Sequence, residues 1–530
     1  MSNRNPHIVI VGGGTSGAVV ASRLSEDPRI SVTLLEAGPD HEAYDEEMRV
    51  PGRAPDRWNG VGTHIVSQPM ALEEGGLSMI QGRVLGGTSA VNGLATLRGQ
   101  PADYDSWAAS GLEGWGWEDV KSTFVAAERD MDFGPSPIHG GDGPLPVRRW
   151  RPDELSRSQA AFREAMLLDG VPGSADINDP DQLPGIGVFP VTIDENLERV
   201  STSLAYLTPE VRARENLRVR VGCEVSTIRI EAEHARGVSL VDGEDIEADE
   251  AVVTAGAIWS AALLLRSGVG PADHLAEHGV SLQADLPVGS TMSDHIGPGI
   301  PYFHDGARGG VGGPAQVVLV GASNGKDIDY HVMPVSLHDP AINPLTFREK
   351  LAFLQRGDGA AESPGWRAAL GALRFLVSPT AGSTLFAVAV FLLRSSGRGS
   401  VRLGDSAGAP VVVAPPLPDD GLDRLRHAFG RIAAWERSAA FRELRPRLLF
   451  PHDLDAPDAV EAALARNPLS YGHMVGTCPM GPVLDADCRV HGIGNLRVAD
   501  ASVMPTIPCG NTYLGCVMVA ERIACKMKMG

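Results

Sequence analysis

The chain has 530 residues, of which 43% are hydrophobic and 21% are charged, and its formal net charge is −20 at pH 7. This length exceeds the ~250–300 residues at which a single hydrophobic core stops growing, so we expect at least two cores. The acidic balance argues against a nucleic-acid partner, because no surplus of basic side chains is available to neutralise phosphates.

No targeting segment or membrane span is predicted. Residues 1–6 are polar, and the apolar stretch that follows is too short for a signal peptide. The stretch 366–393 is interrupted by Arg374 and by polar residues, so it falls short of the ~18–20 apolar residues that a span requires. The six cysteines form no Cys-x-x-Cys pair, which argues against a zinc site. We expect a cytoplasmic protein with reduced thiols and no metal.

The first forty residues have the pattern of a nucleotide-binding βαβ unit. An apolar run over 7–11 ends in glycines, an alanine-rich segment with helical spacing follows, and a second apolar strand over 31–35 ends at Glu36. The G-x-G-x-x-G positions are held by Gly12, Gly14 and Gly17. The strand, the helix and the acid at the right distance together predict an adenine dinucleotide site.

Each part of this unit has a physical role. The first glycine permits the tight turn, the second lets the backbone approach a pyrophosphate, and the third lets helix and strand pack closely. The helix N-terminus, with Thr15 and Ser16, offers N–H groups to the phosphates. Glu36, followed by Ala37, is placed to accept hydrogen bonds from the adenosine ribose.

The stretch 82–92 is a second glycine-rich turn that opens a predicted helix. Alone, this turn could be a helix-capping loop. Together with Gly99 and Asp105 it resembles the first signature of the glucose–methanol–choline (GMC) family of FAD-dependent oxidoreductases. The resemblance implies that the turn lines the flavin through Gly86, Gly87, Thr88, Asn92 and Gly93. Some members bind flavin covalently through a histidine whose position here holds Val91, so we expect non-covalent FAD.

Three further segments resemble parts of the same family. Residues 250–271 resemble its second signature, with Ala261 in place of a usual proline. The segment at Val225 matches a contribution to the adenine pocket, and 286–295 matches the place where the chain leaves the flavin domain. His295, in this last segment, is interpreted as a structural cap rather than a catalyst.

The C-terminal seventy residues contain the catalytic candidates. His473 lies in a segment that resembles the His-x-x-Gly-Thr segment of the family, and Asn511 falls on the position of its second catalytic residue. Alcohol oxidation requires removal of a proton from oxygen, which a neutral imidazole can accept near pH 7. The resemblance also implies flavin contacts from Asp500, Ala501, Asn511 and Thr512. His491 is interpreted as structural.

The fold class predicted is an α/β Rossmann-like FAD-binding domain plus an α+β substrate domain with an antiparallel sheet flanked by helices. The FAD-binding domain is predicted to be discontinuous, with residues 1–155, 215–300 and 462–530, and the substrate-binding domain takes 156–214 and 301–461. Strands over 316–320, 328–333, 385–393 and 399–403 are assigned to the antiparallel sheet, with a helix over 420–439 behind it. Helices are expected over 345–376, within a stretch, 343–383, that looks longer than its counterparts. The segment 39–80 shows no clear period.

The function predicted is FAD-dependent oxidation of an alcohol to the aldehyde, by hydride transfer to the flavin with His473 as base. A primary alcohol, aromatic or furanic, is favoured, with dioxygen or another electron acceptor, in a monomer or homodimer. Two alternatives stay open: the same scaffold could run a lyase or decarboxylase reaction, or act as a dehydrogenase with an acceptor other than oxygen. A nicotinamide enzyme and a non-catalytic flavin-binding module are less well supported, because neither explains both the second glycine turn and His473.

Overall fold

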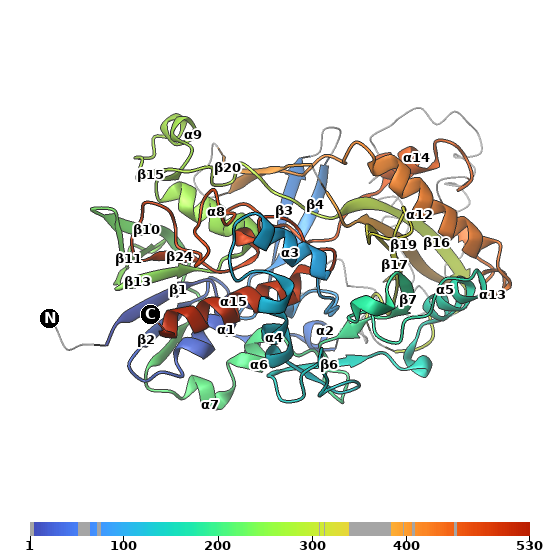
Figure 1. The fold of residues 1–530 in the computed structure, drawn as a ribbon, viewed down its shortest axis with the longest axis horizontal. Helices are drawn as coiled ribbons and strands as arrows, with labels where there is room; N and C mark the ends of the chain where they lie inside the picture. Colours follow the sequence, from blue (N-terminus) through green and yellow to red (C-terminus); the bar gives the residue numbers. More distant parts are fainter. Residues whose placement is uncertain are drawn as a thin grey trace.

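The computed structural model describes residues 5–50, 64–71, 76–306, 308–311, 313–338, 383–395, 397–404, 409–449 and 453–529. A parallel sheet lies at one end of the molecule and a larger antiparallel sheet at the other (Figure 1). The helices expected over 345–376 lie outside the described residues, as does nearly all of 343–383. None of the described helices is long and apolar enough to cross a membrane.

The parallel sheet has five strands. Their order is β24 (Leu496–Val498), β13 (Glu250–Val253), β1 (His7–Val11), β2 (Ser31–Leu35) and β9 (Leu217–Arg220). The strands are short apolar runs, as expected for a sheet that is covered on both faces. Because all neighbouring strands run parallel, the carboxyl ends of β1, β2, β13 and β24 lie at the same edge of the sheet. Segments from both ends of the chain therefore converge there.

Helices pack on both sides of this sheet. The first, α1 (Thr15–Leu24), lies beside the last, α15 (Thr512–Met529), and α8 (Gly256–Arg266) follows β13 (Figure 1). An ion pair of 2.8 Å between Arg23 Nε and Glu521 Oε2 joins α1 to α15. The C-terminal helix is thus fixed next to the nucleotide-binding helix.

The antiparallel sheet has seven strands. Its order is β22 (Arg447–Leu448), β16 (Ile296–Asp305), β19 (Ser383–Leu392), β18 (Tyr330–His338), β17 (Val317–Gly321) and β7 (Gly185–Val188), with β23 (Pro468–Ser470) also paired to β16. The helices α5 (Arg157–Leu168) and α12 (Gly421–Glu436) cover one face. The fold class predicted from the sequence is confirmed.

Both faces of this sheet are buried. On β17, Val317 and Leu319 belong to the core under the helices, whereas Val318 and Val320 belong to a second apolar cluster on the opposite face. This alternation follows from the two-residue period of a strand. The second cluster includes Cys509, so this face of the sheet looks toward the C-terminal segment that contains the catalytic candidates.

Shorter elements complete the described chain. The helices are α2 (Glu46–Arg49), α3 (Pro101–Ala109), α4 (Trp117–Ala127), α6 (Thr202–Tyr206), α7 (Pro209–Arg212), α9 (Ala272–Glu277), α13 (Ala439–Glu443) and α14 (Ala459–Arg466). The strands are β3 (Ile65–Ala71), β4 (Gly76–Gly82), β5 (Glu128–Asp130), β6 (Leu145–Arg149), β8 (Pro190–Val191), β10 (Val225–Glu231), β11 (His234–Leu240), β12 (Asp245–Glu247), β14 (Val269–Gly270), β15 (Ala284–Asp285), β20 (Ser400–Leu403) and β21 (Pro410–Val413).

One expectation from the sequence is wrong, and one segment contains strands that its sequence pattern does not reveal. The segment 39–80, read as lacking a period, contains the hairpin strand β3 and the start of β4. Its alternation is disguised because the inward position 68 holds Gln68, whose side chain amide donates 3.1 Å to the carbonyl of Pro410. The strand expected over 399–403 exists as β20, but it pairs with β21 in a separate four-stranded sheet with β3 and β4.

Candidate active site

The first glycine turn leaves β1 and opens α1 at the edge where the parallel strands end. Gly12 has a φ of +101°, and a Cβ there would lie 2.7 Å from the carbonyl oxygen of Thr254. A Cβ on Gly17 would lie 1.9 Å from the carbonyl oxygen of Gly12. At Gly14 a Cβ would meet only the Cα of Gly87, at 3.7 Å. The outer two glycines are therefore required by packing, whereas the middle one leaves room for a ligand.

The start of α1 can hold an anion. Gly14 is its N-cap and supplies no side-chain hydrogen bond. The first N–H groups of the helix, at Thr15, Ser16 and Gly17, have no partner within the helix, and the dipole makes this end positive. A pyrophosphate fits this end of the helix.

The second glycine turn packs directly against the first. The N–H of Gly86 donates to the carbonyl of Gly13 at 2.7 Å, and a Cβ on Gly87 would lie 2.7 Å from the Cα of Gly14. Gly86 and Gly87 have positive φ angles of +99° and +53°. The two turns thus form one backbone surface, continued by Thr88, Asn92 and Gly93, as expected for residues that hold one cofactor.

Glu36 ends β2 at the same edge. Its Oε2 accepts from the N–H of Gly13 at 2.8 Å and its Oε1 from the N–H of Gly38 at 2.7 Å. Burial raises the pKa of Glu36 to about 7. A carboxylate has about four acceptor positions, so these two bonds leave capacity for ribose hydroxyls. Ala37 follows, and the N–H of Cys223, just before Val225, donates to the carbonyl of Glu36 at 2.8 Å.

Asp500 follows β24 and is buried with both carboxylate oxygens engaged. Oδ2 accepts from the N–H of Gly256 at 2.8 Å and from the hydroxyl of Ser260, and Oδ1 accepts from the N–H of Ser502. These bonds tie the start of α8 to the segment with Ala501. A cofactor contact in this segment is therefore left to the backbone, because the side chain of Asp500 already serves the protein.

The structure brings His473 and Asn511 together. Asn511 Nδ2 donates to His473 Nε2 at 3.0 Å, and His473 Nδ1 lies 2.9 Å from Nδ1 of His295. The N–H of His473 donates to Asp294 Oδ1 at 2.9 Å. Asn511 directly precedes Thr512, the first residue of α15. With the amide as donor, His473 presents its lone pair at Nε2 and its N–H at Nδ1, toward His295.

His473 is held neutral by its surroundings. Burial lowers its pKa well below the usual value, and the neighbouring His295 and His331 lower it further. Burial also lowers the pKa of His295 to about 3. A neutral imidazole has a nitrogen lone pair that can accept a proton.

The sequence predicts that His295 is a structural cap rather than a catalyst, and its ring makes a contact that this interpretation does not anticipate. Its imidazole is fully buried and points at His473, with the two rings nearly perpendicular at 5.1 Å between centroids. The contact arises because Ser293 pairs with Val475 across two chain segments. Spacing along the sequence gives no sign of this pairing, although the Asp294-His295 pair within a family-like segment was a usable signal.

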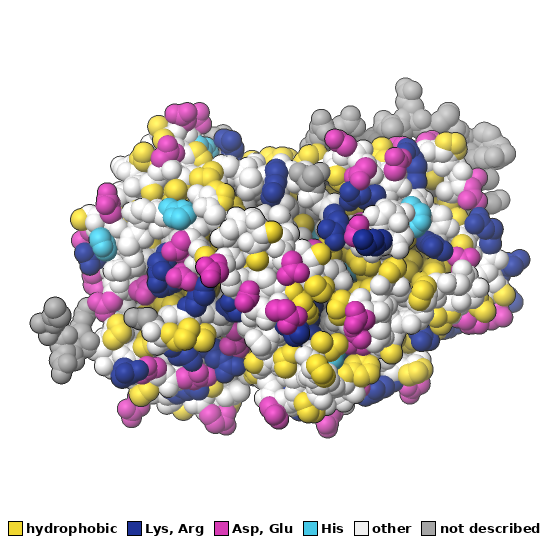
Figure 2. Space-filling model, viewed as in Figure 1, with side chains coloured by type: hydrophobic (Ala, Val, Ile, Leu, Met, Phe, Trp, Pro, Cys, Tyr) yellow, Lys and Arg dark blue, Asp and Glu magenta, His cyan; other side chains and the backbone are white. Residues whose placement is uncertain are grey.

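An aromatic wall borders His473. The ring of Tyr471 lies 4.1 Å from that of His473 and stacks on Phe391 of β19 at 4.2 Å. His331 of β18 approaches the same tyrosine at 6.0 Å, and Met333 Sδ lies 3.6 Å from its hydroxyl. On the face viewed in Figure 2, hydrophobic side chains gather between α3 and α5. None of these wall residues was singled out from the sequence. His491, by contrast, is exposed, with Nε2 3.0 Å from the carbonyl of Gly481.

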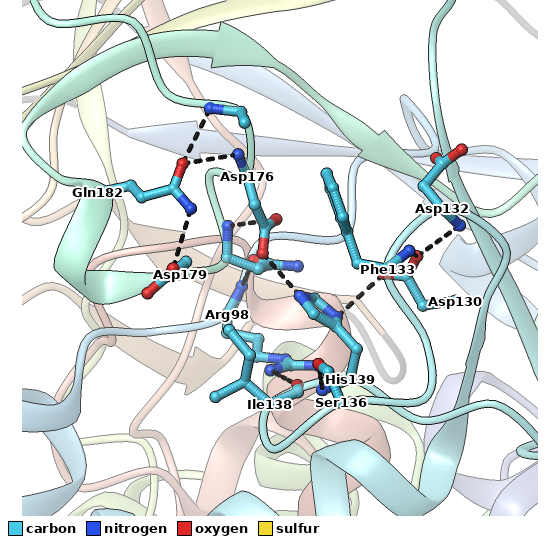
Figure 3. Close-up of polar contacts among 12 residues, drawn as sticks. Arg98, Asp130, Asp132, Phe133, Ser136, Ile138, His139, Asp176, Asp179 and Gln182 are labelled. Carbon is cyan, nitrogen blue, oxygen red and sulfur yellow. Dashed lines mark hydrogen bonds and ion pairs between the residues drawn. The ribbon is translucent and has the colours of Figure 1, made fainter.

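A second polar cluster has the residue types of a metal site. Glu128, Asp130 and His139 place one possible ligand atom each within 4.8 Å of one another. His139 Nε2 lies 2.6 Å from Asp176 Oδ2 and its Nδ1 lies 2.9 Å from Asp130 Oδ2 (Figure 3). The same Nδ1 also lies 2.9 Å from Glu128 Oε1. Burial alone would lower the pKa of His139, but hydrogen bonds with the three carboxylates outweigh it and raise the pKa to about 10.

These carboxylates are already neutralised. Arg98 pairs with Glu128, and Arg149 pairs with Asp130 and, at 2.8 Å, with Asp176. With His139 charged, three cations face three anions. A metal ion would have to displace a proton or an arginine, so the cluster is a closed ion network within the described residues.

Comparison with known proteins shows the family of this chain. Residues 7–297 match a family model described as GMC oxidoreductase, and residues 395–520 match a second model with the same description. The chain therefore belongs to the GMC oxidoreductase family.

Individual relatives match over nearly the whole chain. The 5-(hydroxymethyl)furfural oxidase of Methylovorus sp. is 33% identical, and the match covers 97% of each protein. Pyridoxine 4-oxidase of Microbacterium luteolum is 31% identical, over 98% of this chain and 99% of that protein. The crystal structure of pyridoxine 4-oxidase from Mesorbium loti aligns with a TM-score of 0.84 at 26% identity, covering 99% of this chain and 100% of that one.

These matches confirm four predictions from the sequence: the family, the fold class, an oxidoreductase that acts on CH–OH groups, and FAD as the cofactor. The individual cofactor and catalytic residues, and the domain boundaries, stay predictions.

Proposed function

We propose that this enzyme oxidises a primary alcohol on an aromatic or furanic group to the aldehyde, with His473 as the base. The observation that carries the proposal is the buried His473, neutral and bonded on one side to Asn511 and on the other to His295. A general base needs an acceptor lone pair in a fixed orientation, and a substrate hydroxyl would reach the Nε2 lone pair in place of the Asn511 amide.

The predicted cofactor residues suit FAD. The two glycine turns and the start of α1 suit the pyrophosphate, and Glu36 suits the adenosine ribose. When bound, FAD supplies the two-electron acceptor for the hydride from the substrate carbon. Val91 is buried against Tyr44 and Met48 and has no nucleophilic atom, which supports non-covalent attachment.

His473 and Asn511 have different roles toward the substrate hydroxyl. A substrate hydroxyl placed beside both residues gives its proton to His473 Nε2 and accepts a hydrogen bond from Asn511 Nδ2 while negative charge develops on its oxygen. His295 Nδ1 accepts from His473 Nδ1, which holds the productive tautomer. Asp294 accepts backbone N–H groups from both histidines and so fixes their segments.

The wall beside His473 favours an apolar substrate body. Tyr471 and Phe391 provide flat aromatic surfaces, and Met333 adds a polarisable one. The carboxylate near His473, Asp294, is occupied by two backbone N–H groups and by the hydroxyl of Ser470, so it does not face a cationic substrate. The relatives named for 5-(hydroxymethyl)furfural and pyridoxine support an aromatic alcohol and dioxygen as the electron acceptor.

Anaerobic mixing with alcohols tests this proposal. The purified protein is expected to be yellow, and 5-(hydroxymethyl)furfural or benzyl alcohol should bleach the flavin absorbance, whereas choline should do so poorly. Readmitted air should restore the colour if dioxygen is the acceptor. A panel in which no alcohol bleaches the flavin contradicts the proposal and favours a non-oxidative reaction.

A further inference from the structure

Arg199 is a buried cation that has no anionic partner among the described residues. Its side chain is 3% exposed, and in the described part of the chain it forms no ion pair. Its Nε donates to the carbonyl of Met48 at 2.8 Å, and its Nη1 donates to the carbonyl of Ser89 at 3.1 Å. Burying an unpaired charge is costly, so its presence here calls for a functional reason.

The guanidinium lies directly behind the predicted flavin turn. Nη1 donates to Asn92 Oδ1 at 2.8 Å, and Nη2 donates to the carbonyl of Asn92 at 2.7 Å. The N–H of Leu94 also donates to Asn92 Oδ1, at 3.1 Å. The bonds from Arg199 Nη1 and from the N–H of Leu94 both end on the side-chain oxygen of Asn92. The Asn92 Nδ2 group is therefore turned away from Arg199 and is free to donate to a ligand.

The charge itself is retained at neutral pH. Burial lowers the pKa of Arg199 to about 10, and the nearby hydroxyls of Tyr44 and Tyr513 act in the opposite direction. Tyr513 belongs to the first turn of α15, whose N-terminus is also positive. Arg199 and the N-terminus of α15 are thus two sources of positive potential that lie near one another.

We propose that Arg199 is a positioning residue for the cofactor ring, which orients the Asn92 amide as a donor and favours negative charge on the reduced ring. The inference rests on the proposed function, because it places the flavin against this turn. A buried positive charge favours negative charge nearby far more than an exposed one does, since little water screens it.

Sulfite binding tests the charge without any alcohol substrate. Sulfite adds its electron pair to oxidised flavin, forms an N–S bond and leaves negative charge on the ring, and the bleached absorbance gives its dissociation constant. Arg199→Met and Arg199→Gln remove the charge, and Arg199→Lys keeps it. All variants are reconstituted with excess FAD, and FAD content and thermal unfolding are measured alongside. The control is Arg266→Met, which replaces a half-buried arginine at the C-terminal end of α8.

We expect the two neutral variants to bind sulfite about tenfold or more weakly, as for loss of a charged hydrogen bond, and Arg199→Lys and Arg266→Met to stay near wild type. For the two-electron couple of the flavin, a tenfold change in an equilibrium constant corresponds to about 30 mV in reduction potential. Unchanged sulfite binding in the neutral variants, or an equal loss in Arg199→Lys, overturns the proposal. Loss of FAD in all three Arg199 variants assigns the residue a structural role only. A wild-type protein without FAD would instead remove the cofactor assignment on which the inference rests.

Discussion

His473, His295 and His331 form a group of buried imidazoles in which each neighbour disfavours the charge of the next. Burial and the proximity of His295 lower the pKa of His331 to about 3. The arrangement keeps the proposed base neutral, but it lowers the free energy of unfolding at acid pH. A histidine that is neutral when folded and ionises near 6.5 when unfolded binds protons preferentially in the unfolded chain, so its contribution to stability falls as the pH drops below 6.5.

The substitution His331→Phe should reduce the acid sensitivity of folding. Above pH 6.5 the histidine is neutral in both states and contributes no pH dependence. Between pH 6.5 and about 3 each such histidine lowers the free energy of unfolding by about 1.4 kcal/mol per pH unit. The difference between urea midpoints at pH 7 and pH 5 should therefore be smaller in His331→Phe than in wild type. An identical acid shift would contradict the burial argument, and His491→Gln, at an exposed site, is the matched control.

The sequence allowed part of this site to be predicted. His473 and Asn511 stand in segments whose local pattern resembles the family, and the structure places their side chains in contact. His295, Tyr471 and His331 were missed as site residues. Their roles come from strand pairing between distant segments, which residue spacing does not encode.

Among the elements, the two glycine turns show how local sequence and tertiary contact combine. Each turn could be recognised from its own glycines. Their contact, through the bond from Gly86 to Gly13 and the close approach of Gly87 to Gly14, is a property of the fold alone. The hairpin of β3 and β4 was missed for the opposite reason, because Gln68 at a buried position hides the alternation that usually identifies a strand.

A pair of glycine substitutions should separate packing from cofactor binding. In Gly17→Ala the new Cβ meets the carbonyl oxygen of Gly12, and the overpacking should destabilise the protein by about 1–3 kcal/mol or more. In Gly14→Ala the Cβ makes an ordinary contact with Gly87, so thermal unfolding of the FAD-free protein should change little. Its methyl group should nevertheless weaken FAD binding by about tenfold or more, because it blocks close approach of the pyrophosphate to backbone N–H groups.

Thermal unfolding of the FAD-free proteins and titration with FAD measure the two effects. If Gly14→Ala binds FAD as tightly as wild type, the pyrophosphate does not lie against this turn.

For the whole molecule, the ion network around His139 joins pieces of chain that are distant in sequence. Arg98 follows the second glycine turn, Arg149 ends β6, and Asp176 lies between α5 and β7. The network therefore crosses the predicted boundary at residue 155 between the two domains. Composition gave no indication of it, since its members are common surface residue types.

Removing one partner from this network should destabilise the protein strongly. Arg149→Met leaves Asp130 and Asp176 with less compensation in a buried setting, at a cost of about 3–5 kcal/mol. Arg151→Met removes the exposed partner of Asp132 and should cost less than about 1 kcal/mol.

Chelation separates an ion network from a metal site. Treatment with EDTA should change neither thermal unfolding nor activity of wild type, because the carboxylates are already paired. A fall in the unfolding temperature on chelation, reversed by added metal, would show that the cluster holds a metal ion.

The proposed alcohol oxidation depends on proton removal by His473, and the rate of anaerobic flavin bleaching by 5-(hydroxymethyl)furfural tests this step most directly. His473→Ala should keep its FAD and lose about 10²–10⁴-fold in this rate, while His491→Ala should retain the wild-type rate. Bleaching of His473→Ala at the wild-type rate, with FAD bound, would contradict the assignment of His473 as the base.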